Sequence, residues 1–104
     1  MRDYKKPHCP LSEIKKLLQN EDSRVITSRC INDAYSLGYV SDEQIVGRCL
    51  SLTLSEFHVS VTHDSDNTLW LDSYVTQDEH FKIYIKFQKN HDGNAVIISF
   101  HETD

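Results

Sequence analysis

The chain has 104 residues, of which 38% are hydrophobic and 26% are charged, and its formal net charge is −5. This length suits one domain with a single core, so we expect residues 1–104 to form one domain. No apolar run approaches the roughly 20 residues that span a bilayer, and the charged N-terminus lacks the apolar core of a signal peptide. We therefore expect a soluble protein of the cytoplasm.

The charge is unevenly distributed along the chain. Residues 1–30 carry seven Lys or Arg and four Asp or Glu, whereas residues 31–104 carry four and twelve. This balance argues against an extended nucleic-acid-binding surface, because phosphate binding needs clustered cations. This charge distribution still allows a small local basic face. It also allows a neutral or basic protein partner to bind the acidic surface.

The potential metal ligands show no strong pattern. Cys9, Cys30 and Cys49 lack zinc-ligand spacing, and we interpret them as buried thiols because free cysteine is among the most buried residue types. The stretch His63-Asp64-Ser65-Asp66 contains metal-binding groups, but it also fits a plain turn. We expect neither a metal nor a cofactor.

The first half of the chain shows helical periodicity. Leu11, Ile14, Leu17 and Leu18 mark one face of a short helix that begins near Pro10.

Capping signals predict where the next helices begin and end. A second helix should start after Thr27 as its N-cap and end before Gly38, which suits the left-handed position after a helix. Ser41-Asp42-Glu43-Gln44 is a capping-box pattern and predicts the start of a third helix. Thr53-Leu54-Ser55-Glu56 has the same spacing and predicts a single helical turn before Phe57.

From Phe57 onward the period becomes two. The first strand is predicted to place Phe57, Val59 and Val61 on one face and His58, Ser60 and Thr62 on the other. A second strand is predicted over residues 68–75, between turns at 64–67 and 76–79. We therefore predict an α+β fold, with N-terminal helices packed on a C-terminal antiparallel sheet of about four strands.

The last two predicted strands form a hairpin. Phe81–Phe87 alternates between apolar and polar residues, and Ala95–His101 is an apolar run that ends in histidine. Asp92-Gly93 lies between them and is a strong signal for a two-residue turn.

The register of such a turn places Tyr84 opposite His101 and Lys86 opposite Ser99. Side chains directly opposite each other in an antiparallel pair have Cβ atoms roughly 5 Å apart. We therefore expect Lys82, Tyr84, Lys86 and His101 on one face. A phenol, an imidazole and two ammonium groups suit a polyanionic ligand and acid–base chemistry on it.

Several short motifs occur along the chain in a specific order and spacing. They are Leu11-Ser12, Ile14-Lys15-Lys16-Leu17, Ser55-Glu56-Phe57, Thr68-Leu69-Trp70-Leu71-Asp72-Ser73-Tyr74, Tyr84-Ile85-Lys86 and Ile97-Ile98-Ser99-Phe100. In this order and spacing, from Pro7 to Phe100, the chain resembles the MqsR family of toxins from bacterial type II toxin–antitoxin systems. The Thr-x-Trp-x-Asp-x-Tyr and Ser-Glu-Phe blocks are the most distinctive.

The resemblance implies a fold, an activity and a partner. The fold is the RelE/ParE-like microbial-ribonuclease architecture, and the activity is metal-independent cleavage of messenger RNA. The partner is a cognate antitoxin of the MqsA type, with a zinc-binding domain and a DNA-binding helix-turn-helix domain. The family's proposed active residues are a lysine, a glutamine, a tyrosine and a second lysine. Their positions fall on Val59, Leu71, Tyr84 and His101.

Tyr84 and His101 are our candidate catalytic residues. RNA cleavage without a metal needs a base for the 2′-hydroxyl, an acid for the leaving 5′-oxygen and a cation for the charge on the phosphoryl group. Histidine suits both proton-transfer roles because its unperturbed pKa is near 6.5. The candidate RNA contacts are Lys82, Lys86, His58 and His63.

Each of these residues also has a structural interpretation. His101 would then be an exposed residue at a strand end, and the lysines would be the solvent face of a half-buried sheet. Trp70 suits base stacking, but we favour a core anchor between sheet and helices.

Two functions of different classes therefore remain open. The first is a toxin that acts as an mRNA endonuclease with an altered active site. The second is a non-catalytic binding module that keeps the fold and the partner surface, since Val59 and Leu71 make the family's active face more apolar. A toxin with another target, as in the gyrase-directed branch of the superfold, has only fold analogy behind it.

Overall fold

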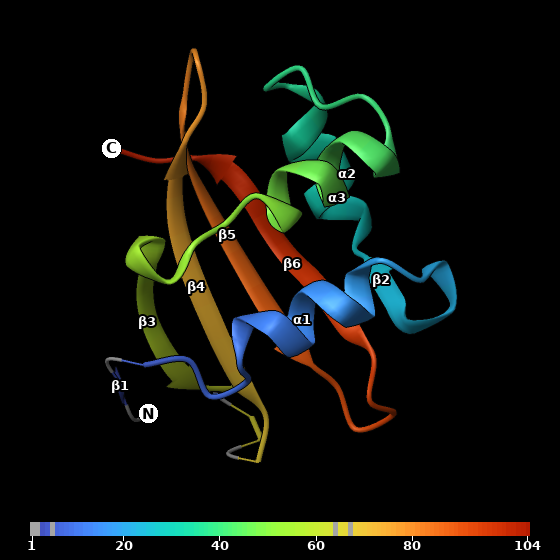
Figure 1. Cartoon of the computed structure of the whole chain (residues 1–104), viewed down its shortest axis with the longest axis vertical. Helices are drawn as coiled ribbons and strands as arrows, with labels where there is room; N and C mark the ends of the chain where they lie inside the picture. The colour runs from blue at the N-terminus through green and yellow to red at the C-terminus, as the bar shows by residue number, and fades with distance from the viewer. Residues whose placement is uncertain (1–2, 5, 64, 67) are drawn as a thin grey trace.

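The computed structural model of the chain describes residues 3–4, 6–63, 65–66 and 68–104. Within these ranges, three α-helices lie on one face of a six-stranded sheet (Figure 1). The helices are α1 (Leu11–Leu18), α2 (Ser28–Tyr35) and α3 (Asp42–Leu50), with short 3-10 turns η1 (Glu21–Ser23) and η2 (Leu54–Glu56). The strands are β1 (Asp3–Tyr4), β2 (Arg24–Ile26), β3 (Phe57–Thr62), β4 (Trp70–Gln77), β5 (Lys82–Lys89) and β6 (Ala95–Glu102). None of the helices in these ranges has the length and apolar character that a membrane span requires.

The predicted limits of α2 are confirmed. The Thr27 hydroxyl caps its start by accepting a backbone N–H. At its end, the Tyr39 N–H donates to the Ala34 carbonyl and the Gly38 N–H donates to the Tyr35 carbonyl. These two bonds form a Schellman motif around Gly38, whose φ of 91° favours glycine.

Both capping-box segments begin helical turns as predicted. The Ser41 hydroxyl accepts the Gln44 N–H at 3.2 Å where α3 begins. At η2, the Glu56 carboxylate accepts the Thr53 N–H at 2.9 Å. Glu56 also accepts a hydrogen bond from the Thr76 hydroxyl on β4 at 2.5 Å, so the cap connects η2 to the sheet.

Glu56 is held in its ionised form by this network. Partial burial opposes ionisation, but the hydrogen bonds from Thr76 and Thr53 and the charge of Arg48 outweigh it, so the pKa of Glu56 is lowered. Arg48, on α3, donates to the same Thr76 hydroxyl at 2.7 Å. The cluster therefore joins a helix, a 3-10 turn and a strand.

The sheet order is β1-β3-β4-β5-β6-β2, and the α+β class is confirmed. Strands β3 to β6 form the antiparallel meander of four strands that the sequence predicts. Strand β1 pairs antiparallel with β3, and β2 pairs parallel with β6. The sequence did not predict these two edge strands, because segments of two and three residues are too short to show a period.

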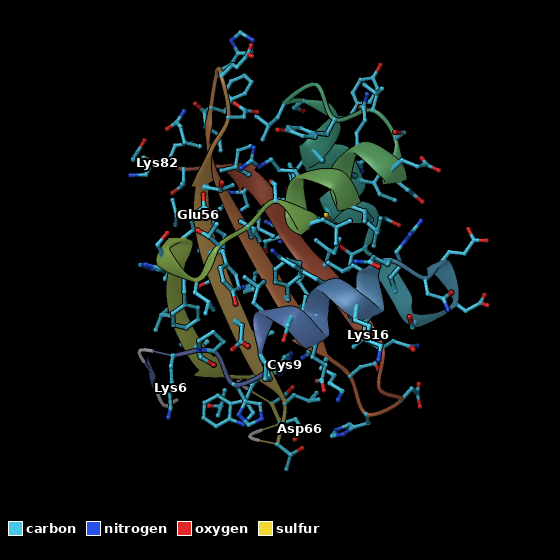
Figure 2. All side chains as sticks on the ribbon, viewed as in Figure 1. Lys6, Cys9, Lys16, Glu56, Asp66 and Lys82 are labelled. Carbon is cyan, nitrogen blue, oxygen red and sulfur yellow. The ribbon has the colours of Figure 1, made fainter. Side chains whose placement is uncertain are left out.

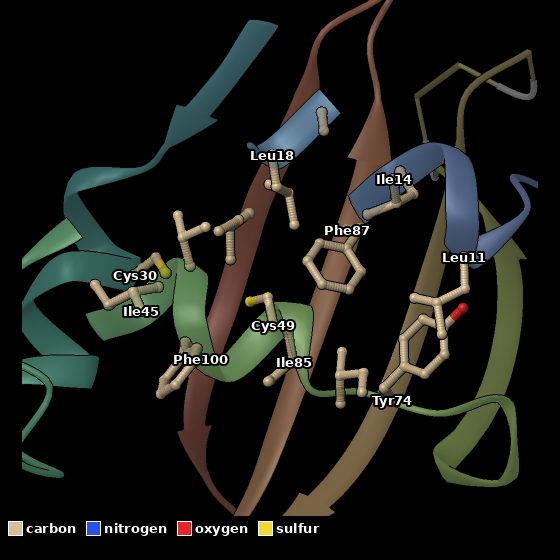
Figure 3. Close-up of a cluster of buried hydrophobic side chains, with 14 of the residues drawn as sticks. Leu11, Ile14, Leu18, Cys30, Ile45, Cys49, Tyr74, Ile85, Phe87 and Phe100 are labelled. Carbon is tan, nitrogen blue, oxygen red and sulfur yellow. The ribbon is translucent and has the colours of Figure 1, made fainter. Parts of the chain in front are cut away.

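One face of the sheet packs against the helices to form the core (Figure 3). The largest fully buried side chains in it are Tyr74, Phe87, Phe100, Ile14, Leu18, Ile45, Leu52, Ile83, Ile85 and Ile97. Burial of each such aliphatic or aromatic side chain stabilises the fold by about 1.5–3 kcal/mol. Removal of this face from water is therefore what fixes the sheet against the helices.

The three cysteines are free and buried, as predicted. Burial raises the thiol pKa of Cys9 and Cys30 to about 12, and it raises that of Cys49 as well. Since the thiolate is the reactive form, none of the three suits a nucleophile at neutral pH.

The other face of the sheet carries no helix in the described part of the chain, and we call it the open face. Its side chains alternate with those of the core along each strand, except at the bulges in β3 and β6 that are described below. They are His58, Val59 and Val61 from β3, Leu71, Ser73, Val75 and Gln77 from β4, Lys82, Tyr84, Lys86 and Gln88 from β5, and Val96, Ser99 and His101 from β6.

The β5–β6 hairpin differs from the prediction at its turn. The loop has one residue more than predicted, because Asn90 and Asn94 close it and Gly93 adopts a left-handed φ of 83°. Near the turn, Phe87 accordingly pairs with Ile97. A β-bulge at Ile98 then shifts the pairing by one residue in the opposite sense.

Beyond this bulge, the predicted register is confirmed. Tyr84 lies opposite His101, and Lys86 lies opposite Ser99.

The predicted alternation in β3 is wrong at its start. Phe57 pairs with Tyr74 and Val59 pairs with Ser73, so His58 is an extra residue in a β-bulge. Past this bulge, Val59 faces the open side, while Ser60 is buried on the helix side. The bulge places two consecutive side chains, His58 and Val59, on the same face.

Of the two turns predicted on either side of β4, the structure fully describes the one that follows β4. The turn at 76–79 lies later than predicted, because β4 continues to Gln77 and the Asp78 carboxylate accepts the N–H groups of His80 and Phe81. In the turn at 64–67, Asp64 and Asn67 lie outside the described residues.

Candidate active site

Tyr84 lies at the centre of the open face. Its ring stacks on the His101 ring of β6, with centroids 5.2 Å apart and planes at 19°. The pair arises from the hairpin register, which sets the two residues directly opposite each other. The predicted phenol–imidazole pair is therefore present.

His58 contacts Tyr84 from the opposite side. The two ring centroids are 6.4 Å apart, with the planes at 74°. Because β4 separates β3 from β5, His58 reaches over the Val75 position, which is the β4 residue opposite Tyr84. The phenol thus lies between two imidazoles, one from β3 and one from β6.

The hydrogen bonding of His101 indicates which ring nitrogen is available. Its Nδ1 lies 3.0 Å from the carbonyl oxygen of Glu102. A carbonyl can only accept, so Nδ1 carries the proton in this contact. Nε2 is then the nitrogen that can exchange a proton with a substrate, and the side chain is exposed to solvent.

The two candidate lysines flank Tyr84 along β5. Lys86 and Lys82 are each two residues from Tyr84, a spacing of roughly 7 Å along a strand. Lys86 lies between Ser73 and Ser99 and is half-buried, whereas Lys82 is exposed at the end of the sheet. The structure therefore brings both cations and the phenol onto one face.

The open face is apolar at two positions where the resemblance noted above implies polar active residues. Val59 and Leu71, which occupy those positions, are half-buried on the open face. The Ser73 hydroxyl between them donates to the Val59 carbonyl at 2.9 Å.

His63 is the one candidate that the structure separates from this group. It follows the end of β3, five residues beyond His58, or roughly 16 Å along a strand. Its Nδ1 accepts the Ser65 N–H at 3.1 Å. An RNA contact at His63 stays a prediction, but it would lie apart from Tyr84.

Sequence reasoning missed Asp72, a buried carboxylate on the helix side. It accepts the backbone N–H groups of His8 at 3.1 Å and Cys9 at 2.9 Å, and the Ser60 hydroxyl at 2.5 Å. The available signal was an acidic residue at an inward position of the alternating β4 motif. Asp72 fixes the segment before α1 to the sheet.

Trp70 also lies on the helix side, next to this anchor. Its ring is half-buried and stacks on His8, with centroids 4.6 Å apart and planes at 11°. It packs against the N-terminal segment at the edge of the core rather than between sheet and helices, and it does not belong to the open face.

Metal ligands do not gather in the described part of the chain: no three His, Cys, Asp or Glu side chains there could hold one ion. The chemistry that the open face offers is that of imidazole, phenol and ammonium groups. Such a set can move protons and bind phosphate.

Comparison with known proteins identifies a family and a relative of this chain. Residues 6–102 match the family described as "Motility quorum-sensing regulator, toxin of MqsA". The chain is also 35% identical over 99 residues to the mRNA interferase toxin MqsR of Escherichia coli (strain K12), which covers 92% of this chain and 94% of the relative. The match extends over α1 to β6, including every residue of the open face. The chain therefore belongs to the MqsR toxin family.

Proposed function

We propose that this chain, acting as one domain over residues 1–104, is a toxin that cleaves messenger RNA without a metal on its open face. The observation that carries the proposal is the stacked Tyr84–His101 pair between Lys82 and Lys86. Support also comes from the relative that is named an mRNA interferase.

Each side chain has a role that its chemistry suits. His101 presents Nε2 to solvent and donates a proton to the leaving 5′-oxygen. Tyr84 holds the imidazole by stacking and offers its hydroxyl to the phosphoryl group. Lys86 neutralises charge on the phosphoryl oxygens, and Lys82 contacts a neighbouring phosphate.

The proposal is tested by RNA cleavage with the purified protein in the presence of a metal chelator. The wild type is expected to cleave single-stranded RNA. His101→Ala and Tyr84→Phe should be slower, with a loss of about 100-fold for the removal of a proton donor. His91→Ala is the matched control, because this exposed histidine pairs with Asp66 in a turn region of the molecule.

Two outcomes would contradict parts of the proposal. Equal rates for the wild type, His101→Ala and Tyr84→Phe would exclude both residues from the mechanism. No cleavage by the wild type would contradict the nuclease itself. It would instead support the binding module that the apolar Val59 and Leu71 suggest, although the named relative favours the nuclease.

We further propose that the chain acts in the cytoplasm and that its own antitoxin resembles MqsA, which the family description names as the antitoxin. The chain is acidic overall, so a neutral or basic surface on the antitoxin would complement it. Co-expression with an antitoxin of the MqsA type should relieve the growth arrest that the toxin causes and yield a complex that survives size-exclusion chromatography. Failure of the antitoxin to bind would contradict this pairing.

A further inference from the structure

We infer that His58 is the second catalytic residue, the general base that takes the proton from the 2′-hydroxyl of the RNA. This inference rests on the proposed nuclease function and assigns the step that His101 cannot perform while it protonates the leaving group. It is carried by the β3 bulge, which places a second imidazole against Tyr84.

The backbone positions His58 in an unusual way. In a regular strand, consecutive side chains point to opposite faces, so Val59 on the open face would send His58 into the core. The extra residue between Phe57 and Val59 removes this restriction. His58 is therefore exposed on the open face, with its ring 6.4 Å from that of Tyr84.

The imidazole of His58 is available for proton transfer. No hydrogen bond or ion pair engages its ring nitrogens among the described residues, where its ring contact is with Tyr84. His101 contacts the same phenol from β6 with the planes nearly parallel. The two imidazoles thus approach the Tyr84 ring from opposite sides, one from β3 and one from β6.

This arrangement matches the requirement of the reaction. In an in-line displacement, the attacking 2′-oxygen and the leaving 5′-oxygen lie on opposite sides of phosphorus. His58 accepts the 2′-hydroxyl proton as the 2′-oxygen–phosphorus bond forms, and His101 gives its proton to the 5′-oxygen as the phosphorus–oxygen bond breaks. The products are a 2′,3′-cyclic phosphate and a 5′-hydroxyl, with no oxidant, reductant or metal consumed.

The two proton-transfer roles can be separated with a modified substrate. RNA with sulfur in place of the bridging 5′-oxygen has a leaving group that departs as a thiolate, so it needs no general acid. On ordinary RNA, His58→Ala and His101→Ala should each lower kcat by about 100-fold or more. On the 5′-thio substrate, His101→Ala should regain the wild-type rate, whereas His58→Ala should remain slow.

Further variants separate chemistry from folding. His58→Gln keeps a polar side chain of similar size but cannot accept the proton, so it should be as slow as His58→Ala. Added imidazole should partly restore the His58→Ala variant. His91→Ala should match the wild type on both substrates, since its ring pairs with Asp66.

The outcomes distinguish this inference from the proposed function. If the wild type cleaves RNA and His58→Ala or His58→Gln retains its kcat, the role of His58 is refuted while the nuclease stands. If the 5′-thio substrate rescues His58→Ala instead of His101→Ala, the assignment of base and acid is refuted. If the wild type cleaves neither substrate, the proposed function itself fails.

Discussion

At the residue scale, the polar side chains fall into two groups, those that hydrogen-bond within the fold and those on the open face. Asp72 and Glu56 lie on the helix side and accept several hydrogen bonds each from the surrounding fold. On the open face, His58 and His101 each contact Tyr84 through their rings. The satisfied groups stabilise the fold, and the ring cluster remains available to a ligand.

Replacement of Asp72 should be costly to stability. Asp72→Ala leaves the N–H groups of His8 and Cys9 without their acceptor, and the Ser60 hydroxyl as well. Since hydrogen bonds to a charged group contribute about 1.5–3 kcal/mol each, we expect a loss of about 3 kcal/mol in the free energy of unfolding. Urea denaturation measures this loss. Asp104→Ala, at the exposed C-terminus, is the control, and equal stability of the two variants would contradict the anchoring role.

The residues that sequence reasoning found and missed differ in a physical way. Tyr84, His101 and Lys86 were placed correctly because two unpredicted changes cancel: the extra loop residue shifts the register by one, and the bulge at Ile98 shifts it back. Asp72 could not be interpreted, because its partners are backbone N–H groups some 60 positions away, His8 at a separation of 64 and Cys9 at 63. No local pattern encodes such a contact.

At the element scale, irregular pairing determined where the prediction failed. The bulge in β3 has no signal in the alternation Phe57–Thr62, which reads as a regular strand. The local helix signals performed better, because caps such as Thr27 and Gly38 act through neighbours a few residues away. Local chemistry was therefore predictable, and tertiary adjustments of strand geometry were not.

The Glu56 cap makes stability depend on pH in a defined direction. Its folded-state pKa lies below the ordinary value near 4.3. The ionised carboxylate therefore stabilises the fold above that pH, and this contribution is lost as the pH falls through the lowered pKa. We expect Glu56→Gln to reduce the decline in the free energy of unfolding between about pH 6 and about pH 3.

Urea denaturation across this pH range measures the effect. Glu79→Gln is the matched control, since Glu79 is an exposed glutamate beside the β4–β5 turn. Identical pH profiles for Glu56→Gln and the wild type would show that the η2 cap carries no pH-dependent stability.

At the scale of the whole molecule, the sequence predicted the class and the central sheet. Helices first and an antiparallel meander afterwards are both present. The edge strands β1 and β2 were beyond prediction, because their pairing partners lie far away in the chain. The parallel pairing of β2 with β6 depends on how the chain is packed around α2. The three residues of β2 carry no pattern that would predict it.

The overall charge limits how the molecule can bind RNA. The chain has a net charge of −5, and its open face carries two lysines, Lys82 and Lys86. Two histidines lie beside Tyr84 on the same face. If about three phosphates are neutralised, the logarithm of affinity should fall with the logarithm of salt concentration with a slope of about −2 for single-stranded RNA. Fluorescence anisotropy of a labelled RNA with a catalytically inactive variant measures the slope, and Lys86→Ala should make it shallower. A slope many times steeper would place the RNA on a different surface.

The two one-residue shifts in the β5–β6 hairpin have a consequence for how this fold tolerates change. The loop closed by Asn90 and Asn94 is one residue longer than the two-residue turn, and the bulge at Ile98 cancels the difference before the strands reach Tyr84 and His101. In Figure 2, Lys82 at the start of β5 and Asp66 in the loop before β4 lie toward opposite ends of the molecule. The bulge therefore compensates for the length of the loop. Removal of one loop residue can be compensated by loss of the bulge at Ile98, which keeps Tyr84 opposite His101.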